Sequence, residues 1–393
     1  MANNGSGQKI RYGPDMKILI IGGGVAGLTL AGLLQRRGFA PRLVEKAPAF
    51  GKVGYVIVIW PSGSRVLKGL GAYEKLLEEG CQFTNYYISN YKGKVIKTYT
   101  IDPVAEKYGP IISIYRPELI DTLLASVNPE FIDMNTTVEK IEQGTDTAEV
   151  HFSDGSSEQY DLVIGCDGVR SKTREQIFGH IPLTYSGMSG WGFWIDPNLS
   201  KPDGIVEYWG KGKFIGVWPT KGRLSVFTSV KMAEKNIDPV DSRIDRIKEC
   251  FKEFGGVVPD MLDQLNDPNE IYYDTYNDMQ IDGWSKGRVV LVGDSAHAIL
   301  PNAGAGVSMA MESAAVIAEE LCRADSKYIE HALKQYETRR KPRVKKVQNQ
   351  SRMMGKLVYS NSSILSTARD YFLKVYSNDL VYKYWDSMLK DPI

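Results

Sequence analysis

The run Met16-Lys17-Ile18-Leu19-Ile20-Ile21-Gly22-Gly23-Gly24-Val25-Ala26-Gly27 decides the fold of this chain. It predicts a buried strand, a glycine turn and a helix, followed by a second strand that leads to Glu45. In such a unit Gly22 allows a tight turn, Gly24 lets backbone amides approach a pyrophosphate, and Gly27 lets the helix pack close to the strand. Glu45 is spaced to accept hydrogen bonds from a ribose diol. The run therefore predicts a dinucleotide site, without saying which dinucleotide it holds.

The overall composition narrows the classes of function. A length of 393 residues favours about two to three domains, and 43% of the residues are hydrophobic. The net charge of +1 argues against broad nucleic-acid binding, which needs a basic surface. Four cysteines without a CxxC pair and four scattered histidines argue against a metal site. The same cysteine usage favours a reducing, cytoplasmic location.

Two segments near the N-terminus resemble targeting or membrane segments. Residues 16–34 are largely apolar, but five glycines interrupt them, so we expect a strand and a helix and no transmembrane segment. The polar residues 1–15 are expected to form a disordered leader.

Two further apolar strands end at turns that carry an acid. Asp167-Gly168 follows the strand within Asp161–Arg174, and Gly293-Asp294 follows a third strand. Either turn alone is equally well explained as a simple turn cap. Because the carboxyl ends of parallel strands meet at one edge of a sheet, we expect all three turns to lie together at a ligand site.

The three motifs, in this order, resemble those of the class A (single-component) FAD-dependent monooxygenases. This family includes para-hydroxybenzoate hydroxylase, urate hydroxylase, zeaxanthin epoxidase and the tetracycline-inactivating monooxygenases. The matching features are GxGxxG at 22–27, the Asp-Gly motif at 161–174, Gly-Asp-x6-Pro at 293–301, and an Arg-x-x-Leu helix start at 116–119. The resemblance extends from Lys17 to about Arg340 and so covers most of the chain.

The resemblance implies a noncovalently bound FAD. By position in the family motifs, the residues expected to contact it are Gly22, Gly24, Ala26, Gly27, Glu45, Lys46, Arg116, Asp167, Asp294, Pro301, Gly304, Ala305, Gly306 and Val307. Asp167 has a structural role that links the FAD site to transient NADPH or NADH binding. Arg170 and Arg174 are the expected partners of the phosphates of this co-substrate. The sequence does not distinguish NADH from NADPH.

The chain departs from the family at its third motif. The family pattern Gly-Gln-Gly-x-Asn is replaced by Gly304-Ala305-Gly306-Val307-Ser308, with Glu312 at the acidic position in the helix. Ala305 and Ser308 therefore lack the side-chain amides that the family places near the flavin. We expect His297, within the same motif, to have a packing role, because the chemistry of a flavoenzyme resides in its cofactor.

The strand pattern and the resemblance predict an α/β fold. It comprises a Rossmann-like FAD-binding domain with a mostly parallel sheet, a β-rich substrate domain and a C-terminal helical segment. Residues 51–63 are expected to be irregular. The predicted boundaries are 16–82, 103–182 and 281–335 for the FAD-binding domain, 83–102 and 183–280 for the substrate domain, and 336–393 for the C-terminal helices.

Aromatic residues in the β-rich insertion are candidates for the substrate site. An aromatic sheet could cover the flavin ring and accept a flat hydrophobic substrate, although aromatic residues are equally common in the core of a sheet. Two residues just after the first βαβ unit could line the same cavity. The substrate candidates are Tyr55, Ile57, Trp194, Trp209, Phe214 and Trp218.

The resemblance implies hydroxylation or epoxidation of an aromatic or polycyclic small molecule, with NAD(P)H and O₂ and through a flavin C4a-hydroperoxide. Antibiotic inactivation and natural-product tailoring are two settings for such an enzyme, acting as a monomer or homodimer. A flavin-dependent halogenase is an alternative, but the run 191–196 lacks the second tryptophan and the proline of its Trp-x-Trp-x-Ile-Pro motif. A reductase of isoprenoid double bonds on the same fold is another. The C-terminal helices either pack on the body of the protein or contact a partner or membrane.

Overall fold

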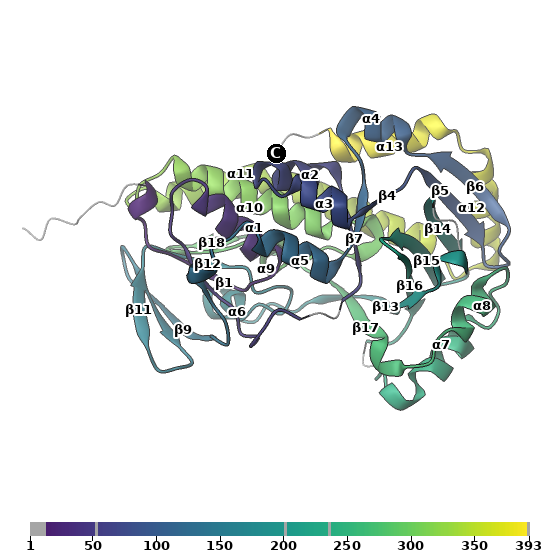
Figure 1. Cartoon of the computed structure of the whole chain (residues 1–393), viewed down its shortest axis with the longest axis horizontal. Coiled ribbons are helices and arrows are strands. Elements are labelled where there is room, and N and C mark those ends of the chain that lie inside the picture. The colour runs from purple at the N-terminus through teal and green to yellow at the C-terminus, as the bar shows by residue number, and fades with distance from the viewer. Residues whose placement is uncertain (1–12, 52–53, 200–202, 235–236, 391–393) are drawn as a thin grey trace, which may run out of the picture.

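The computed structural model describes residues 13–51, 54–199, 203–234 and 237–390 (Figure 1). Residues 1–12 of the predicted disordered leader lie outside the described residues. The remaining three, Gly13–Asp15, form a short 3₁₀ helix instead. Among the described residues, no helix is both long and apolar enough to cross a membrane. The apolar run 16–34 is divided between a strand and a helix, as predicted.

A six-stranded sheet forms the centre of the dinucleotide-binding part. Its strand order is β18-β19-β12-β1-β2-β8, and all neighbours are parallel except β18 and β19. The strands are β1 (Ile18–Ile21), β2 (Arg42–Val44), β8 (Ile132–Asp133), β12 (Leu162–Gly165), β18 (Ser285–Lys286) and β19 (Val289–Leu291). The three strands that precede the three motifs, β1, β12 and β19, are therefore direct neighbours.

The central sheet is buried on both faces, which explains why its strands are apolar throughout. Ile18 and Ile20 of β1 pack against helices, whereas Leu19 and Ile21 pack against a second, antiparallel sheet. Figure 1 shows the helices on one side of the sheet and the small sheet on the other. The helices include α1 (Val25–Gln35), α5 (Arg116–Leu124) and α10 (Gly306–Cys322); the small sheet consists of β9 (Val138–Gln143), β10 (Ala148–Phe152) and β11 (Ser157–Tyr160), and α6 (Lys172–Phe178) packs beside it.

A seven-stranded sheet forms the other half of the molecule. Its order is β17-β13-β16-β15-β14-β5-β6, and only the pair β14 and β5 is parallel. The strands are β5 (Asn85–Asn90), β6 (Val95–Thr100), β13 (Thr184–Ile195), β14 (Gly204–Trp209), β15 (Lys213–Thr220), β16 (Arg223–Lys231) and β17 (Tyr272–Asp278). One face of this sheet packs against α7 (Arg243–Phe251) and α8 (Val258–Asp263). The hairpin β5–β6 reaches the sheet from a distant part of the sequence.

A three-stranded sheet, β3-β7-β4, connects the two halves. β3 (Val56–Ile59) lies within the stretch that we expected to be irregular, and this prediction was wrong for these four residues. They form a strand because they pair antiparallel with β7 (Ile112–Tyr115). The other elements of this region are α2 (Pro61–Gly69), α3 (Tyr73–Glu79), β4 (Cys81–Gln82) and α4 (Asp102–Tyr108).

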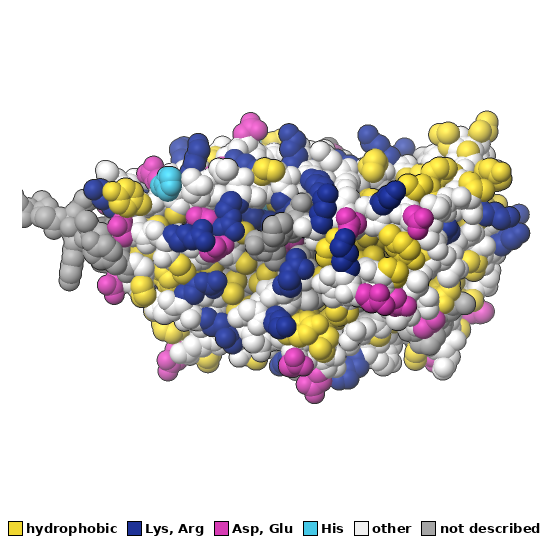
Figure 2. All heavy atoms as spheres, turned by 90° about the horizontal axis from the view of Figure 1, so that it is seen from above, with side chains coloured by type: hydrophobic (Ala, Val, Ile, Leu, Met, Phe, Trp, Pro, Cys, Tyr) yellow, Lys and Arg dark blue, Asp and Glu magenta, His cyan; other side chains and the backbone are white. Residues whose placement is uncertain are grey.

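The C-terminal region consists of three helices, α11 (Ile329–Val358), α12 (Ser363–Val375) and α13 (Asn378–Leu389). The predicted boundary at residue 336 falls inside α11, which is a single helix of 30 residues that packs against α10. α12 and α13 lie beside the seven-stranded sheet (Figure 1). Apolar side chains gather at this end of the molecule in Figure 2, and the exposed ones on α12 are Ile364, Leu365, Tyr371, Phe372 and Val375.

Candidate functional site

The glycine turn after β1 is closed to side chains at two positions and open at a third. Gly22 has a φ of +106°, and a Cβ atom there would lie 2.6 Å from the backbone oxygen of Cys166. A Cβ atom at Gly27 would lie 2.0 Å from the backbone oxygen of Gly22, so α1 packs directly on the turn. A Cβ atom at Gly24 would meet no protein atom within 4 Å. The N-terminus of α1 therefore presents bare backbone to open space, as a pyrophosphate requires.

Glu45, directly after β2, lies beside this turn. Its Oε2 accepts a hydrogen bond from the backbone N–H of Gly23 at 2.7 Å, and its Oε1 accepts one from Ala47 at 2.9 Å. Each carboxylate oxygen can accept a second hydrogen bond. Glu45 thus holds the turn in place and retains acceptor capacity for a ribose diol. Lys46 is exposed to solvent, and Arg116 is half-buried at the first turn of α5.

The second motif, after β12, is a compact hydrogen-bonded turn. Asp167 accepts hydrogen bonds from the hydroxyl of Ser171 at 2.5 Å and from the backbone N–H of Thr173 at 2.9 Å, which fixes the start of α6. Arg174 is 3% exposed and donates to the backbone oxygens of Ser295 and Val169 at 3.0 and 2.8 Å. A guanidinium in this position cannot contact the phosphates of NAD(P)H, so the predicted role of Arg174 in binding them is corrected. Arg174 instead connects the second and third motifs through its hydrogen bonds.

The third motif, after β19, contacts the first. A Cβ atom at Gly293 would lie 2.9 Å from the Cβ of Ala26, so this turn packs against the start of α1. Asp294 faces an open cavity, yet surrounding protein desolvates its carboxyl and raises its pKa to about 6. Its carboxyl is thus placed to bind a hydroxyl of a bound cofactor. Arg170, in contrast to Arg174, is exposed.

His297 of the short helix α9 (Asp294–His297) is buried and packed rather than poised for catalysis. Its Nε2 lies 2.9 Å from the hydroxyl of Ser313, and its ring lies 4.8 Å from the ring of Trp284. Burial, aided by the positive charge of Arg340, lowers the pKa of His297 to about 3. The imidazole is neutral at physiological pH.

The depressed pKa of His297 predicts a loss of stability in acid. Between pH 6.5 and about pH 3 the unfolded chain binds a proton at His297 that the folded protein excludes, so the free energy of unfolding falls as the pH drops through this window. The variant H297Q should show a shallower decline in urea titrations at successive pH values. Exposed His180 provides the control, since H180Q should behave like the wild type. Equal slopes for H297Q and the wild type would contradict the prediction.

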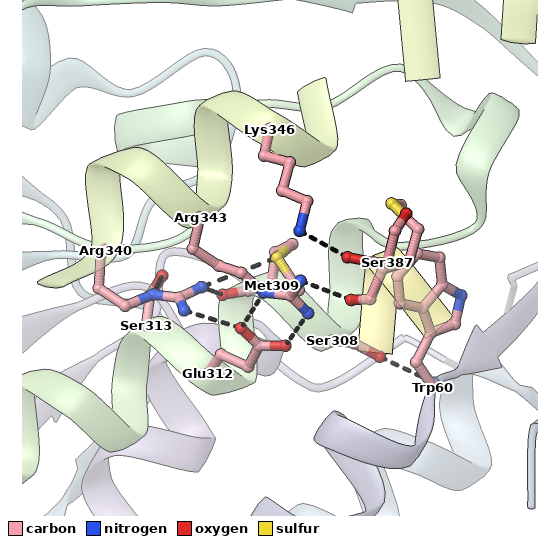
Figure 3. Close-up of polar contacts among 10 residues, drawn as sticks. Trp60, Ser308, Met309, Glu312, Ser313, Arg340, Arg343, Lys346 and Ser387 are labelled. Carbon is pink, nitrogen blue, oxygen red and sulfur yellow. Dashed lines mark hydrogen bonds and ion pairs between the residues drawn. The ribbon is translucent and has the colours of Figure 1, made fainter. Parts of the chain in front are cut away.

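The turns after β1 and β19 and the start of α10 together form what we call the cofactor corner. Gly304 has a φ of +59°, and a Cβ atom at Gly306 would meet no protein atom within 4 Å. Ser308, one of the departures from the family pattern, accepts a hydrogen bond from the backbone N–H of Trp60 at 2.9 Å (Figure 3). The serine therefore connects α10 to the junction of β3 and α2. Bare backbone at Gly306 remains open to a ligand.

A buried ion cluster lies behind this corner (Figure 3). Glu312 of α10 is 1% exposed and contacts Arg340 at 2.7 Å and Arg343 at 3.3 Å, both from α11. Burial opposes ionisation of Glu312, but the two guanidinium groups outweigh it and lower its pKa. The acid thus stays charged and fastens α10 to α11.

The same cluster fixes the last helix. Arg343 donates to the backbone oxygen of Met388, and Lys346 donates to that of Ser387 at 2.5 Å (Figure 3). Cations at the carbonyl end of a helix interact favourably with its dipole. The ring of Trp385 meets that of Trp60 edge-on at 5.7 Å. The helix α13 is therefore held against the cofactor corner at its C-terminal turn.

An apolar cavity of about 650 Å³ opens beside the third motif and extends to α12 and α13. Near the motif it is lined by Asp294, Pro301 and the run 304–307. Further away its wall is the face of the seven-stranded sheet opposite α7 and α8. Of the described residues that line it, apart from tyrosines, only Lys97, Glu207 and Asp294 have titratable side chains.

The structure brings five of the six predicted substrate residues to this cavity: Tyr55, Ile57, Trp209, Phe214 and Trp218. Trp194 is the exception. It lies on the same sheet but away from the cavity, with its ring 5.1 Å from that of Tyr115 and 3.9 Å from the guanidinium of Arg223. Its predicted place in the substrate site is therefore corrected.

Among the cavity residues that the sequence prediction did not name is one acid. Glu207 of β14 is 8% exposed and lies in the wall between aromatic neighbours. The available signal was an acid in the apolar run 204–209, at the position between Ile205 and Trp209 on one face of the strand.

The described residues fit the expected FAD. Two glycine positions have empty space where a Cβ atom would stand, one at the N-terminus of α1 and one at the start of α10. Glu45 and Asp294 offer acceptors for sugar hydroxyls, and the cavity beside 304–307 offers an apolar site for a flat ring. An FAD molecule would place its ADP moiety at α1 and Glu45, its linker near Asp294, and its flavin in the cavity.

Comparison with known proteins places this geometry in context. The family described as "FAD binding domain" matches residues 15–351. An aurachin C monooxygenase/isomerase of Stigmatella aurantiaca is 29% identical over 93% of this chain and 96% of its own length. A 3-amino-4-hydroxybenzoate 2-monooxygenase of Streptomyces cremeus is 29% identical over 91% of each chain. The crystal structure of Klebsiella pneumoniae HpxO with FAD and uric acid shares the fold, with a TM-score of 0.90, 24% identity, and coverage of 97% of this chain and 98% of HpxO.

Proposed function

This chain belongs to the FAD-binding domain family and is an FAD-dependent monooxygenase. We propose that it uses NAD(P)H and O₂ to hydroxylate or epoxidise an uncharged aromatic or polycyclic small molecule. One observation carries the proposal. The turns after β1, β12 and β19 lie on neighbouring strands, and the third of them opens into an apolar cavity. A dinucleotide held at the turns would extend its ring into that cavity.

In this proposal the protein binds and positions its ligands, and the cofactor supplies the redox chemistry. Backbone at Gly24 and Gly306 would approach the cofactor, Glu45 would hold the ribose, and Asp294 would bind a hydroxyl nearer the ring. Pro301, Gly304, Ala305 and Val307 would border the ring, since they line the cavity beside it. Exposed Arg170 is left as the proposed contact for NAD(P)H phosphates.

The cavity wall would exclude water from the reacting atoms. Aliphatic and aromatic side chains form most of it, and α13, held in place by Arg343 and Lys346, closes one side. Exclusion of water strengthens electrostatic interactions in a site and protects reactive species from side reactions. A flat, apolar substrate is the ligand that such a wall accommodates.

The test is oxidation of NADPH and of NADH by the FAD-loaded protein, with and without a panel of phenols, N-heterocycles and polyketides. We expect a flavin absorption spectrum, substrate-stimulated NAD(P)H oxidation, and incorporation of one atom of ¹⁸O₂ into the product. Product formation that needs no O₂ would favour a reductase, and product that needs chloride or bromide would favour a halogenase. Purified protein that neither carries nor takes up FAD would overturn the proposal.

A further inference from the structure

Glu207 stands out because an acid is unexpected in this wall. β14 alternates, so that Val206 and Tyr208 pack in the core beneath α7 and α8, whereas Ile205, Glu207 and Trp209 face the cavity. Burial of a carboxyl group in apolar surroundings is costly unless it is paired. In the part of the chain that the structure describes, no ammonium or guanidinium group forms an ion pair with Glu207.

The neighbours of Glu207 hold its carboxyl in one orientation. The hydroxyl of Tyr86 donates a hydrogen bond to Oε1, and Nε1 of Trp209 donates one to Oε2 at 2.7 Å. Tyr86 is itself stacked on Tyr99, with ring centroids 5.0 Å apart. Both donors come from within the sheet, so the carboxyl is fixed without any contact from a cation. Each oxygen can accept one further hydrogen bond.

The surrounding cations are engaged elsewhere. Lys97 lines the cavity, but its Nζ donates to the backbone oxygen of Tyr376 at 2.5 Å. Arg369 lies 5.2 Å above the ring of Trp209 and donates to the backbone oxygen of Val358 at 2.8 Å. At Glu207 a negatively charged ligand would therefore meet the acid itself, whereas these two cations already donate to backbone carbonyls.

We propose that Glu207 anchors the substrate, by accepting a hydrogen bond from an N–H or O–H group on an uncharged aromatic ring that carries a hydrocarbon substituent. The inference rests on the proposed function, because it assigns the polar contact within that same site. The ring donor would meet the acid, and the substituent would lie along the apolar part of the wall formed by residues such as Phe214, Leu373 and Val381. Anionic aromatic acids would be rejected by charge repulsion.

Three matched probes test this assignment: 4-heptylphenol, 4-heptylanisole and 4-heptylbenzoate. They share a ring and a chain, and differ in having a donor, a blocked donor or a negative charge. Binding is measured on the FAD-loaded protein without NAD(P)H, by tryptophan fluorescence and flavin absorbance. We expect the phenol to bind about tenfold more tightly than the anisole, and the benzoate to bind most weakly. Equal affinity for the phenol and the anisole, or tighter binding of the benzoate, would overturn the inference.

The variant E207Q should reduce the preference for the phenol from about tenfold to about threefold, the level of a neutral hydrogen bond, because charge-assisted bonds are the stronger ones. Tyr208→Phe is the control, since Tyr208 lies on the same strand and faces the other core. It should keep the wild-type preference. If E207Q retains the full preference while its melting curve matches the wild type, the inference fails.

The pH dependence gives a second readout that needs no variant. Burial raises the pKa of Glu207 to about 7, against the opposing effect of its two hydrogen bonds. The phenol-to-anisole ratio should rise from pH 6 to pH 8 as the acid ionises, and should stay flat in E207Q. The tyrosines around it remain neutral in this range, because burial raises their pKa values further above 10: Tyr86, Tyr99, Tyr359 and Tyr384. Asp294, with a pKa of about 6, also lines the cavity, so the comparison with E207Q isolates Glu207.

The inference and the proposed function fail in different ways. Binding is read without turnover, so a protein that prefers the phenol but never consumes NAD(P)H would retain the anchor and lose the monooxygenase proposal. A protein that oxidises NAD(P)H with many substrates, yet ignores the ring donor, would keep the function and lose the anchor.

Discussion

Replacing Glu312 with glutamine is expected to lower the free energy of unfolding by about 3–5 kcal/mol, the usual cost of removing one member of a buried ion pair. The acid is almost fully buried and forms ion pairs with both Arg340 and Arg343. Glutamine has nearly the same shape, so the loss would reflect the two guanidinium groups left without a counter-charge. Urea denaturation of the FAD-free and FAD-loaded protein measures it.

Glu319→Gln on the same helix is the matched control. Glu319 pairs with Arg323 and Arg339 at the surface, where its side chain is 37% exposed. Surface pairs contribute about 0–1 kcal/mol, so this variant should unfold almost like the wild type. Similar losses in E312Q and E319Q would show that the buried cluster has no special role. A loss in E312Q should also loosen α13, which limited proteolysis near residue 388 would detect.

The second large effect is expected at Gly24. The Gly24→Ala variant should bind FAD at least tenfold more weakly, a change of about 1.4 kcal/mol, while the free energy of unfolding of the FAD-free protein changes little. Its φ of −77° suits alanine, and the added methyl group would meet no protein atom within 4 Å. It would instead occupy the space proposed for the pyrophosphate. Titration of the FAD-free protein with FAD, followed by flavin fluorescence, gives the affinity.

Two other glycines make the comparison decisive. Gly27→Ala should lose both stability and FAD binding, because its methyl group would clash with the backbone oxygen of Gly22. Gly69→Ala, at the end of α2 and in open space, should lose neither. Unchanged FAD affinity in Gly24→Ala would exclude the glycine turn as the pyrophosphate site.

The three strand-end motifs could be predicted because each combines an apolar strand with a turn residue at its end. Their adjacency follows from parallel pairing, and the structure confirms it in the order β19-β12-β1. The α/β fold and its β-rich second part were predictable for the same reason, since runs of apolar, alternating and helical residues differ in period. The strand β3 was missed because its partner β7 lies more than 50 residues away in the sequence.

The errors at the site have a common physical origin. In β14 all six residues are buried, so alternation cannot show which face meets a helix layer and which meets a cavity. Trp194 and Trp209 look alike in sequence, yet only Trp209 lines the cavity, and nothing in the alternation singled out Glu207 as a cavity residue. Arg174 was misassigned because a motif fixes its position in the chain, whereas tertiary packing directs its side chain inward to Ser295.

The wall of the cavity also has a kinetic consequence. It joins Tyr55 to Trp385, which are about 330 residues apart in the chain. Contacts of such high sequence separation close large loops and form late, after the locally paired strands and helices. We therefore expect the contact between Trp60 and Trp385 of α13 to form after the folding barrier is crossed, so that weakening it should accelerate unfolding while leaving the rate of folding nearly unchanged. The lifetime of the closed cavity is set by the contacts that form last.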